Sequence, residues 1–245
     1  MSIKADKLNF KYNSNEILKS ISFEFDSQST GLLGPNGSGK TTLIKIICGL
    51  LSHLDGNLFI NDNNINKIKS KNLSKIFAFV SQDYEPTYGF TVRETIEMGR
   101  YPYLGTFGFL TKRDSEIVDE IIELLNLSAL QNNSTDNLSS GEKQKVRIAR
   151  ALAQKPEYII LDEPTSNLDL SNKIILVEIM KQIAKFGTKT IIASHDLNFI
   201  KQITNDCLMI KDGYVLNFGP SNKVINKKNI ENLFDLEILP TWSIT

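Results

Sequence analysis

A glycine-rich loop is the first segment whose residue types and spacing suit chemistry. Residues 34–42 read GPNGSGKTT and match the pattern G-x-x-x-x-G-K-[ST]. Glycines let the backbone curl so that successive N–H groups point inward at phosphate oxygens. Lys40 would reach the β- and γ-phosphates, and the Thr41 hydroxyl would bind Mg²⁺. The sequence therefore predicts a nucleoside triphosphate site formed by Gly34, Pro35, Asn36, Gly37, Ser38, Gly39, Lys40, Thr41 and Thr42.

A pair of adjacent carboxylates is the second such segment. Residues 158–163 read YIILDE, an apolar strand that ends in two acids, which is the Walker B arrangement. We expect Asp162 to hold Mg²⁺ through water and Glu163 to orient or deprotonate the attacking water. The alternative is an acidic strand-to-loop turn without a ligand. The phosphate loop upstream favours the site, because open α/β sheets bind ligands at the carboxyl ends of their strands.

Strand patterns surround both segments. Residues 30–33 form a short apolar run before the glycine-rich loop, and Leu43, Ile46, Ile47 and Leu50 follow it with helical spacing. Further strand-type runs occur at residues 76–80, 158–161, 190–193 and 207–210, and a helical stretch separates some of them. Strands that alternate with helices predict a parallel sheet, so the fold class is α/β. Near the N-terminus, apolar and polar residues alternate over 21–26, which predicts half-buried strands.

The middle of the chain is predicted to be helical. Residues 91–98 have helical spacing, and Thr91 with Glu94 can form a capping box. Ile117, Ile121 and Leu124 mark one face of a second helix, and residues 142–154 form a third. We therefore predict a helical subdomain at about 88–155, inserted into one domain that spans residues 1–245.

Composition excludes several other classes of protein. The 245 residues include 28 basic and 28 acidic residues. This balance argues against a broad basic field, so we expect no nucleic-acid partner. No apolar run approaches the roughly 18 residues of a membrane span, and we expect no signal peptide. The two cysteines, Cys48 and Cys207, lie far apart and are interpreted as small buried residues of a reduced compartment.

Residues 138–142, LSSGE, carry a family resemblance. They open a helix upstream of the Asp-Glu pair and resemble the LSGGQ signature of ATP-binding cassette (ABC) transporter subunits, with Ser140 and Glu142 as departures. The resemblance covers nearly the whole chain. It implies a P-loop NTPase fold with a RecA-like parallel core, an N-terminal antiparallel β subdomain and a helical signature subdomain. It also implies that Ser139 and Gly141 bind the ATP held by a second copy in a head-to-tail dimer.

The same resemblance extends to single residues. Gln82 is similar to the Q-loop glutamine that contacts Mg²⁺ or the lytic water, and His195 resembles the switch histidine that reaches the γ-phosphate. Asp169 resembles the D-loop aspartate at the dimer interface. Tyr12 resembles the aromatic residue that stacks on adenine; the alternative is a half-buried strand tyrosine. The chain is thus expected to be an ATPase with the cofactors ATP and Mg²⁺, the catalytic residues Glu163, His195 and Gln82, and the metal ligands Thr41, Gln82 and Asp162.

Residues 99–105, GRYPYLG, point to a subfamily. Together with residues 91–98 and 168–173, they resemble importers of metal chelates: ferric siderophores, haem or cobalamin. This resemblance implies an integral membrane permease docked near Gln82 and residues 84–105, and indirectly an extracytoplasmic substrate-binding protein. The chain would then be a peripheral protein on the cytoplasmic face of the membrane. The alternatives are a manganese or zinc importer, an exporter, or a non-transport ABC ATPase.

Overall fold

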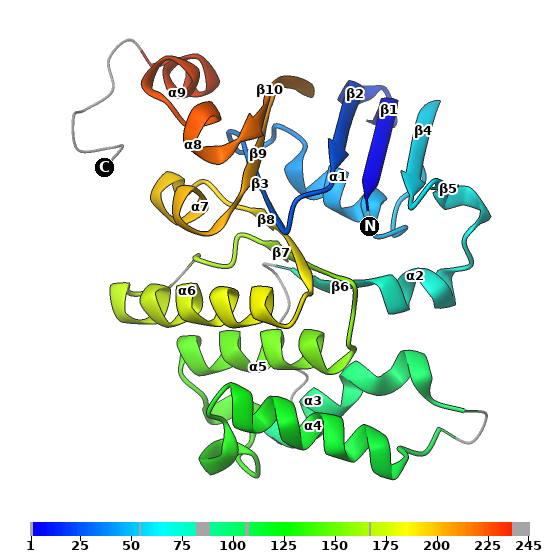
Figure 1. Cartoon of the computed structure of the whole chain (residues 1–245), viewed down its shortest axis with the longest axis vertical. Helices are drawn as coiled ribbons and strands as arrows, with labels where there is room; N and C mark the ends of the chain where they lie inside the picture. The colour runs from blue at the N-terminus through cyan, green and yellow to red at the C-terminus, as the bar shows by residue number, and fades with distance from the viewer. Residues whose placement is uncertain (1, 54, 82–88, 106–107, 167, 237–245) are drawn as a thin grey trace.

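A computed structural model describes residues 2–53, 55–81, 89–105, 108–166 and 168–236. It contains two β-sheets and a set of helices that stack against the larger sheet (Figure 1). The smaller sheet lies near the N-terminus, and the helices of the middle segment lie at the opposite end of the molecule (Figure 1).

The smaller sheet is antiparallel. It consists of β1 (Ile3–Tyr12), β2 (Asn15–Phe25), β4 (Asp55–Ile60) and β5 (Asn63–Asn64), in the order β2-β1-β4-β5. Along β2, Ile21, Phe23 and Phe25 are buried while the residues between them are exposed. This alternation confirms the predicted half-buried strands, because successive side chains of a strand point to opposite faces.

The larger sheet is parallel except at one edge. Its strands are β3 (Ser29–Leu33), β6 (Phe77–Val80), β7 (Tyr158–Asp162), β8 (Lys189–Ala193), β9 (Asp206–Lys211) and β10 (Tyr214–Pro220). The order is β10-β9-β3-β8-β7-β6, and β10 alone pairs antiparallel. The predicted parallel core is therefore confirmed. It brings the carboxyl ends of β3, β7 and β8 to one edge of the sheet.

Both faces of the larger sheet are covered, which explains its continuous apolar strands. In β7, Tyr158 and Ile160 pack with the helix α1 (Lys40–Ile47) and with the inner face of the smaller sheet. Ile159 and Leu161 point the other way, into a core shared with the helices α5 (Ser140–Ala153) and α6 (Leu170–Lys185). The strand that carries the two acids is thus held rigidly from both sides.

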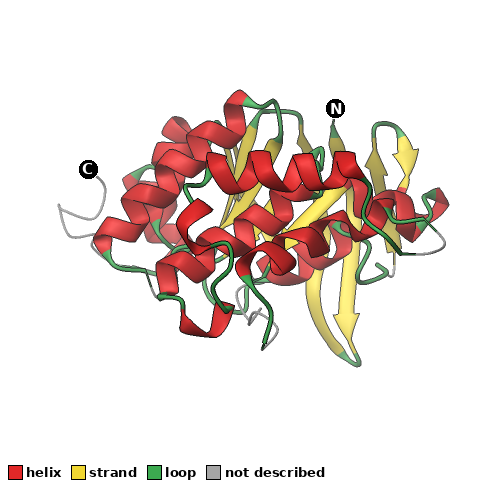
Figure 2. Cartoon of the chain, turned by 90° about the horizontal axis from the view of Figure 1, so that it is seen from below, coloured by secondary structure: helices red, strands yellow, loops and turns green. Residues whose placement is uncertain are grey.

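The middle segment is helical, as expected (Figure 2). Thr91 and Glu94 form the predicted capping box of the first helix. The segment comprises α3 (Val92–Glu97), η2 (Met98–Tyr103), α4 (Lys112–Leu124), η3 (Ser128–Leu130), η4 (Thr135–Asn137) and α5. The other helices are η1 (Ile65–Lys67), α2 (Ser70–Ile76), α7 (Leu197–Ile203), α8 (Ser221–Val224) and α9 (Lys227–Phe234). The longest helix of the described residues, α6, has 16 residues, and none in that part of the chain is long and apolar enough to cross a membrane.

Two local expectations were wrong. Leu50 does not share the buried face of α1, because Gly49 adopts a φ of 70° just beyond the end of that helix and leaves Leu50 61% exposed. Ile76 ends α2 instead of starting the strand β6. The helix α2 has only one buried residue, Leu73, so its sequence carries little apolar periodicity to predict it from.

Candidate active site

A cleft lies at the carboxyl edge of the larger sheet, where the glycine-rich loop leaves β3 and the acidic pair ends β7. Its volume is about 240 Å³. The residues that line it are Ile17, Asn36, Gly37, Ser38, Gly39, Lys40, Thr41, Thr42, Asp162 and Glu163. The structure thus brings the two motifs predicted from the sequence into one site, since β3 and β7 both pair with β8.

Glycines in the loop are required by its backbone. Gly39, the N-cap of α1, has a φ of 105°, in the left-handed region that side chains disfavour. Gly34 follows β3, and a Cβ there would overlap the carbonyl oxygen of Ile210 and lie 2.5 Å from Ser38 Oγ. The loop therefore turns tightly into the positive end of α1, which is the usual geometry for binding a phosphate anion.

Lys40 folds back over the loop. Its Nζ donates hydrogen bonds to the carbonyl oxygens of Gly34 (2.7 Å) and Pro35 (3.1 Å), and the residue is only 6% exposed. Burial lowers the pKa of the Lys40 ammonium group, and the nearby carboxylates of Glu163 and Asp162 partly oppose that shift. The ammonium group is therefore held inside the loop, at the place where phosphate oxygens would be received.

Thr41 and Asp162 are joined directly. Thr41 Oγ1 donates a 2.7 Å hydrogen bond to Asp162 Oδ2. Burial raises the pKa of the Asp162 carboxyl, and the hydrogen bond from Thr41 partly offsets it. The other oxygen, Asp162 Oδ1, is buried and has no hydrogen-bond partner among the described residues. A buried carboxylate oxygen without a partner is costly, so a bound cation would satisfy it.

These residues fit Mg²⁺. Thr41 offers a hydroxyl and Asp162 a carboxylate, and both are hard oxygen ligands of the kind that Mg²⁺ prefers. Mg²⁺ in nucleotide sites is commonly held by few protein ligands together with phosphate oxygens and water. No group of three or more His, Cys, Asp or Glu suitable for a metal occurs in the described ranges, which suits such a shared site better than an all-protein cage.

Glu163 and His195 form a second pair at the rim. Glu163 has a φ of 50°, and its N–H donates to the carbonyl oxygen of Ala193 (2.8 Å) at the end of β8. Its Oε2 lies 2.8 Å from His195 Nδ1, and its Oε1 is buried without a partner in the described part of the chain. The Glu163 side chain is 11% exposed and the His195 side chain 63% exposed.

The signature-like segment lies elsewhere. Ser139 caps α5: its side chain accepts from the N–H of Glu142, while Ser139 Oγ and N donate to Glu142 Oε2 at 2.6 and 2.8 Å. The two hydrogen bonds that Ser139 donates to Oε2 lower the pKa of the Glu142 carboxyl. Asp169 caps α6 by accepting from the N–H of Asn172 (2.8 Å). Neither Ser139, Gly141 nor Asp169 lines the cleft.

Tyr12, the predicted adenine-stacking residue, does not line the cleft. Tyr12 ends β1, is 46% exposed and packs edge-on against Phe10, with ring centroids 4.8 Å apart. Gln82 lies outside the described residues. Sequence reasoning missed Ile17, which precedes the buried Leu18 of β2 and presents an apolar side chain to the cleft. No local pattern identifies it, because the alternation along β2 breaks between Leu18 and Ile21, where Ser20 has a φ of 52°.

A larger hollow, of about 710 Å³, lies at the other edge of the sheet. It includes Pro156 and Thr188, which precede β7 and β8, together with apolar residues of α4 and α5 such as Ile121 and Leu152. The glycine-rich loop and the acidic pair are absent from its lining. The smaller cleft is therefore the candidate active site, because both motifs line it.

Comparisons with known proteins show the family of the chain. The sequence profile described as "ABC transporter" matches residues 18–166. An uncharacterised ABC transporter ATP-binding protein of Methanocaldococcus jannaschii is 36% identical over 97% of this chain and 92% of its own length. The petrobactin import ATP-binding protein FatE of Bacillus anthracis is 33% identical over 85% of this chain and 83% of its own length.

The fold agrees as well. The solved structure of an inward-facing ABC transporter assigned to the metal-chelate type superposes with a TM-score of 0.83 at 26% identity, over 96% of this chain and 89% of that chain. The profile match, the relatives and the cleft with its glycine-rich loop all point to the same assignment: the chain belongs to the ABC transporter family and is an ATP-binding subunit with ATPase chemistry.

Proposed function

We propose that this chain is the ATP-hydrolysing subunit that energises import of a metal chelate, such as an iron siderophore, haem or cobalamin, through a separate membrane permease. The observation that carries the ATPase part is the cleft in which Lys40, the Thr41–Asp162 pair and the Glu163–His195 pair converge. The import part is supported by the similarity to a petrobactin import ATP-binding protein and by the GRYPYLG segment.

Each residue of the cleft takes a role in this proposal. Lys40 and the loop amides of residues 34–42 bind the phosphates. Thr41 and Asp162, with Gln82, would hold Mg²⁺, and the bound ion would neutralise charge on the phosphate oxygens. Glu163 orients the attacking water and accepts its proton, since its buried Oε1 is otherwise without a partner in the described ranges. His195 holds the Glu163 carboxylate from the other side and hydrogen-bonds the γ-phosphate.

A second copy of the chain completes the site. Ser139, Gly141 and Asp169 lie away from the cleft of their own chain, at the N-termini of α5 and α6. Helix N-termini attract phosphate, so these segments suit the nucleotide of another subunit. In a head-to-tail dimer, each ATP would be bound by one phosphate loop, the Tyr12 ring beside adenine, and the partner's signature segment. Hydrolysis would then require closure of the dimer.

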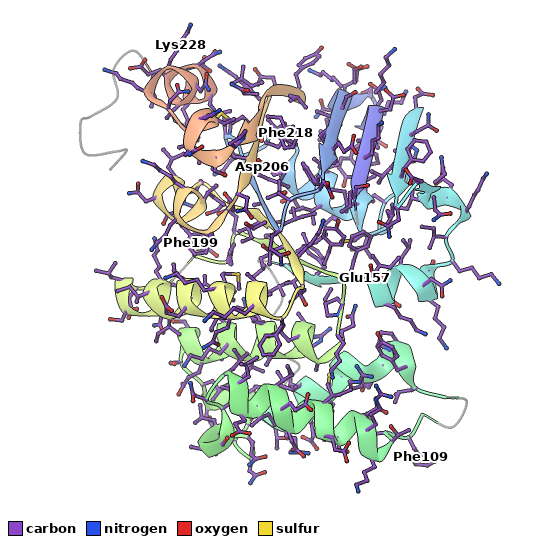
Figure 3. All side chains as sticks on the ribbon, in the orientation of Figure 1. Phe109, Glu157, Phe199, Asp206, Phe218 and Lys228 are labelled. Atoms are coloured by element: carbon purple, nitrogen blue, oxygen red, sulfur yellow. The ribbon has the colours of Figure 1, made fainter. Side chains whose placement is uncertain are left out.

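The surface around η2 is the proposed permease contact. Tyr101 and Phe109 are 60% and 80% exposed, and Phe109 projects from the helical end of the molecule (Figure 3). Exposed aromatic side chains of this size commonly mark interaction surfaces. Beneath them, Arg100 is buried, donates to Asp114 Oδ1 (2.8 Å) and lies 4.1 Å from the Tyr103 ring centroid. The chain would thus be a peripheral protein on the cytoplasmic face, and an extracytoplasmic binding protein would deliver the chelate to the permease.

Affinity capture tests this proposal. Tagged Glu163→Gln protein would be recovered from detergent-solubilised native membranes with ATP, and Lys40→Ala protein would serve as a matched control with weakened ATP binding. Recovery of a polytopic permease with the first variant supports transport, and the permease's identity separates chelate import from manganese or zinc import and from export. Recovery of ribosomes, DNA or soluble partners alone would favour a non-transport ABC ATPase.

A further inference from the structure

Gly141 faces another residue of its own chain. A Cβ built on Gly141 would overlap Oδ1 and Cγ of Asn172 and would lie 2.8 Å from Asn172 Nδ2. Contacts under 3.0 Å are essentially never found for real Cβ atoms. The side of Gly141 on which a side chain would project is therefore filled by the side chain of Asn172, which any residue larger than glycine would have to displace.

Asn172 also belongs to the neighbouring segment. It lies in the first turn of α6, and its backbone N–H donates 2.8 Å to Oδ1 of Asp169, the N-cap of that helix. Its half-buried side chain reaches across to the first turn of α5, where Ser139 is the N-cap. One residue thus connects the two helix N-termini that carry Ser139 and Asp169.

The two helices pack side by side around this contact. Figure 1 shows α5 stacked directly below α6. The groove between them is narrow and is lined by Gly141, Gln144, Lys145, Ile148, Leu168, Asn172, Ile175, Leu176 and Ile179. Gly141 lies in the first turn of α5 and Asn172 in the first turn of α6, so their contact fixes the distance between the amino ends of the two helices.

We propose that Asn172 is a positioning residue that fixes the signature segment relative to the D-loop segment. The inference rests on the proposed function, in which both segments meet the nucleotide and surface of a second copy. A bound phosphate tolerates little displacement of its hydrogen-bond donors. Shortening Asn172 frees the two segments to shift relative to each other, while the cleft that binds ATP in the single chain is untouched.

The experiment measures ATP-induced dimerisation by light scattering in a Glu163→Gln background. The variants are Gly141→Ala, Asn172→Ala and the two together. Ser171→Ala, alone and combined with Gly141→Ala, is the matched control at the exposed neighbouring position. We expect Gly141→Ala to raise the ATP concentration for half-maximal dimerisation about tenfold or more, as coupled contacts of 0.5–3 kcal/mol allow. Adding Asn172→Ala should bring it back to the level of the Asn172→Ala variant alone, because the overlapping atoms are gone while the positioning contact stays lost.

The Asn172→Ala variant alone distinguishes a positioning role of Asn172 from a role in the stability of the fold. We expect unchanged ATP affinity of the monomer and an unchanged urea midpoint, but dimerisation weakened about three- to tenfold. Unchanged dimerisation would overturn the positioning role, and that variant remains informative if Gly141→Ala does not fold. A double variant as defective as Gly141→Ala, or equal rescue by Ser171→Ala, would also overturn it. If the Glu163→Gln parent itself stays monomeric with ATP, the dimer of the proposed function fails instead.

Discussion

His195 Nδ1 lies 2.8 Å from Glu163 Oε2, although the two residues follow different strands. The contact forms because β7 and β8 are parallel neighbours and the N–H of Glu163 also donates to Ala193 at the end of β8. The histidine thereby occupies one carboxylate oxygen, while the other, Oε1, is buried and without a partner among the described residues. The orientation of the Glu163 carboxylate is thus fixed before any nucleotide binds.

Glu163→Gln is the first test of this arrangement. The amide keeps the shape of the side chain but cannot accept a proton, so ATP binding is retained while kcat falls about 10²-fold or more. Steady-state phosphate release and equilibrium ATP binding measure the two effects. Glu157→Gln is the matched control, because Glu157 is exposed at the amino end of the same strand (Figure 3). Turnover at the unmodified rate would exclude Glu163 as the residue that activates water.

His195→Ala tests the other member of the pair. Loss of the imidazole frees the Glu163 carboxylate and removes a donor to the γ-phosphate, so we expect kcat to fall at least about tenfold with little change in ATP affinity. His53→Ala, at the chain's other histidine, should leave kcat unchanged. Residues that act as a unit are non-additive. The double variant with Glu163→Gln should therefore be no slower than Glu163→Gln alone, and independent, multiplying losses would contradict the pairing.

Lys40→Ala tests the phosphate loop. The Lys40 ammonium group is buried within the loop, and a charged hydrogen bond of this kind contributes about 1.5–3 kcal/mol. ATP affinity should therefore fall by roughly 10- to 100-fold. Lys45→Ala, one turn further along α1, removes an equal charge outside the loop and should change affinity much less. Titration with a fluorescent nucleotide measures the affinity of both variants. Equal losses of affinity would mean that only the net charge of the protein matters, and not the place of Lys40 in the loop.

Local sequence predicted the parts of this site that depend on neighbours along the chain. The loop at residues 34–40 and the acids Asp162 and Glu163 at the end of β7 follow directly from strand runs that end in polar residues, and the capping box of Thr91 follows from a glutamate three residues later. Their convergence depends on the order of strands β3, β8 and β7, which no local pattern encodes. The resemblance to ABC subunits supplied that information.

Contacts between distant residues were not predictable. The pairing of Gly141 with Asn172 depends on how α5 packs against α6, and a glycine in a signature-like segment reads equally well as space for a phosphate. The buried pair of Arg100 and Asp114 joins η2 to the start of α4, and nothing in their spacing distinguishes it from an exposed ion pair. In both cases the role of the residue depends on its burial, and burial is determined only by the tertiary structure.

Arg100→Ala should destabilise the fold strongly. Arg100 donates to Asp114 Oδ1 (2.8 Å) and to the Ala153 carbonyl oxygen (2.7 Å), and both side chains of the ion pair are under a tenth exposed. Its loss leaves a buried carboxylate unpaired, which costs about 3–5 kcal/mol of the free energy of unfolding. Lys112→Ala, in an exposed pair with Glu116, should cost less than about 0.5 kcal/mol. Urea unfolding at neutral pH measures the loss in free energy of unfolding for both variants. Similar losses would show that the buried ion pair contributes no more than the exposed one.

Asp114→Asn tests the same pair through its pH dependence. Hydrogen bonds from Thr111, with the Arg100 guanidinium beside it, lower the pKa of the Asp114 carboxyl from 3.8 to about 2. Because the folded-state pKa is depressed, the stabilisation is fully present above pH 3.8 and is lost as pH falls toward 2.

The unmodified protein should exceed the Asp114→Asn variant by about 2 kcal/mol in unfolding free energy at pH 6. This difference should shrink progressively below pH 4, as measured by urea unfolding at pH 6, 4 and 3. Asp119→Asn, at an exposed carboxylate of the same helix, is the control, and a difference independent of pH would show that the ionised form of Asp114 contributes nothing.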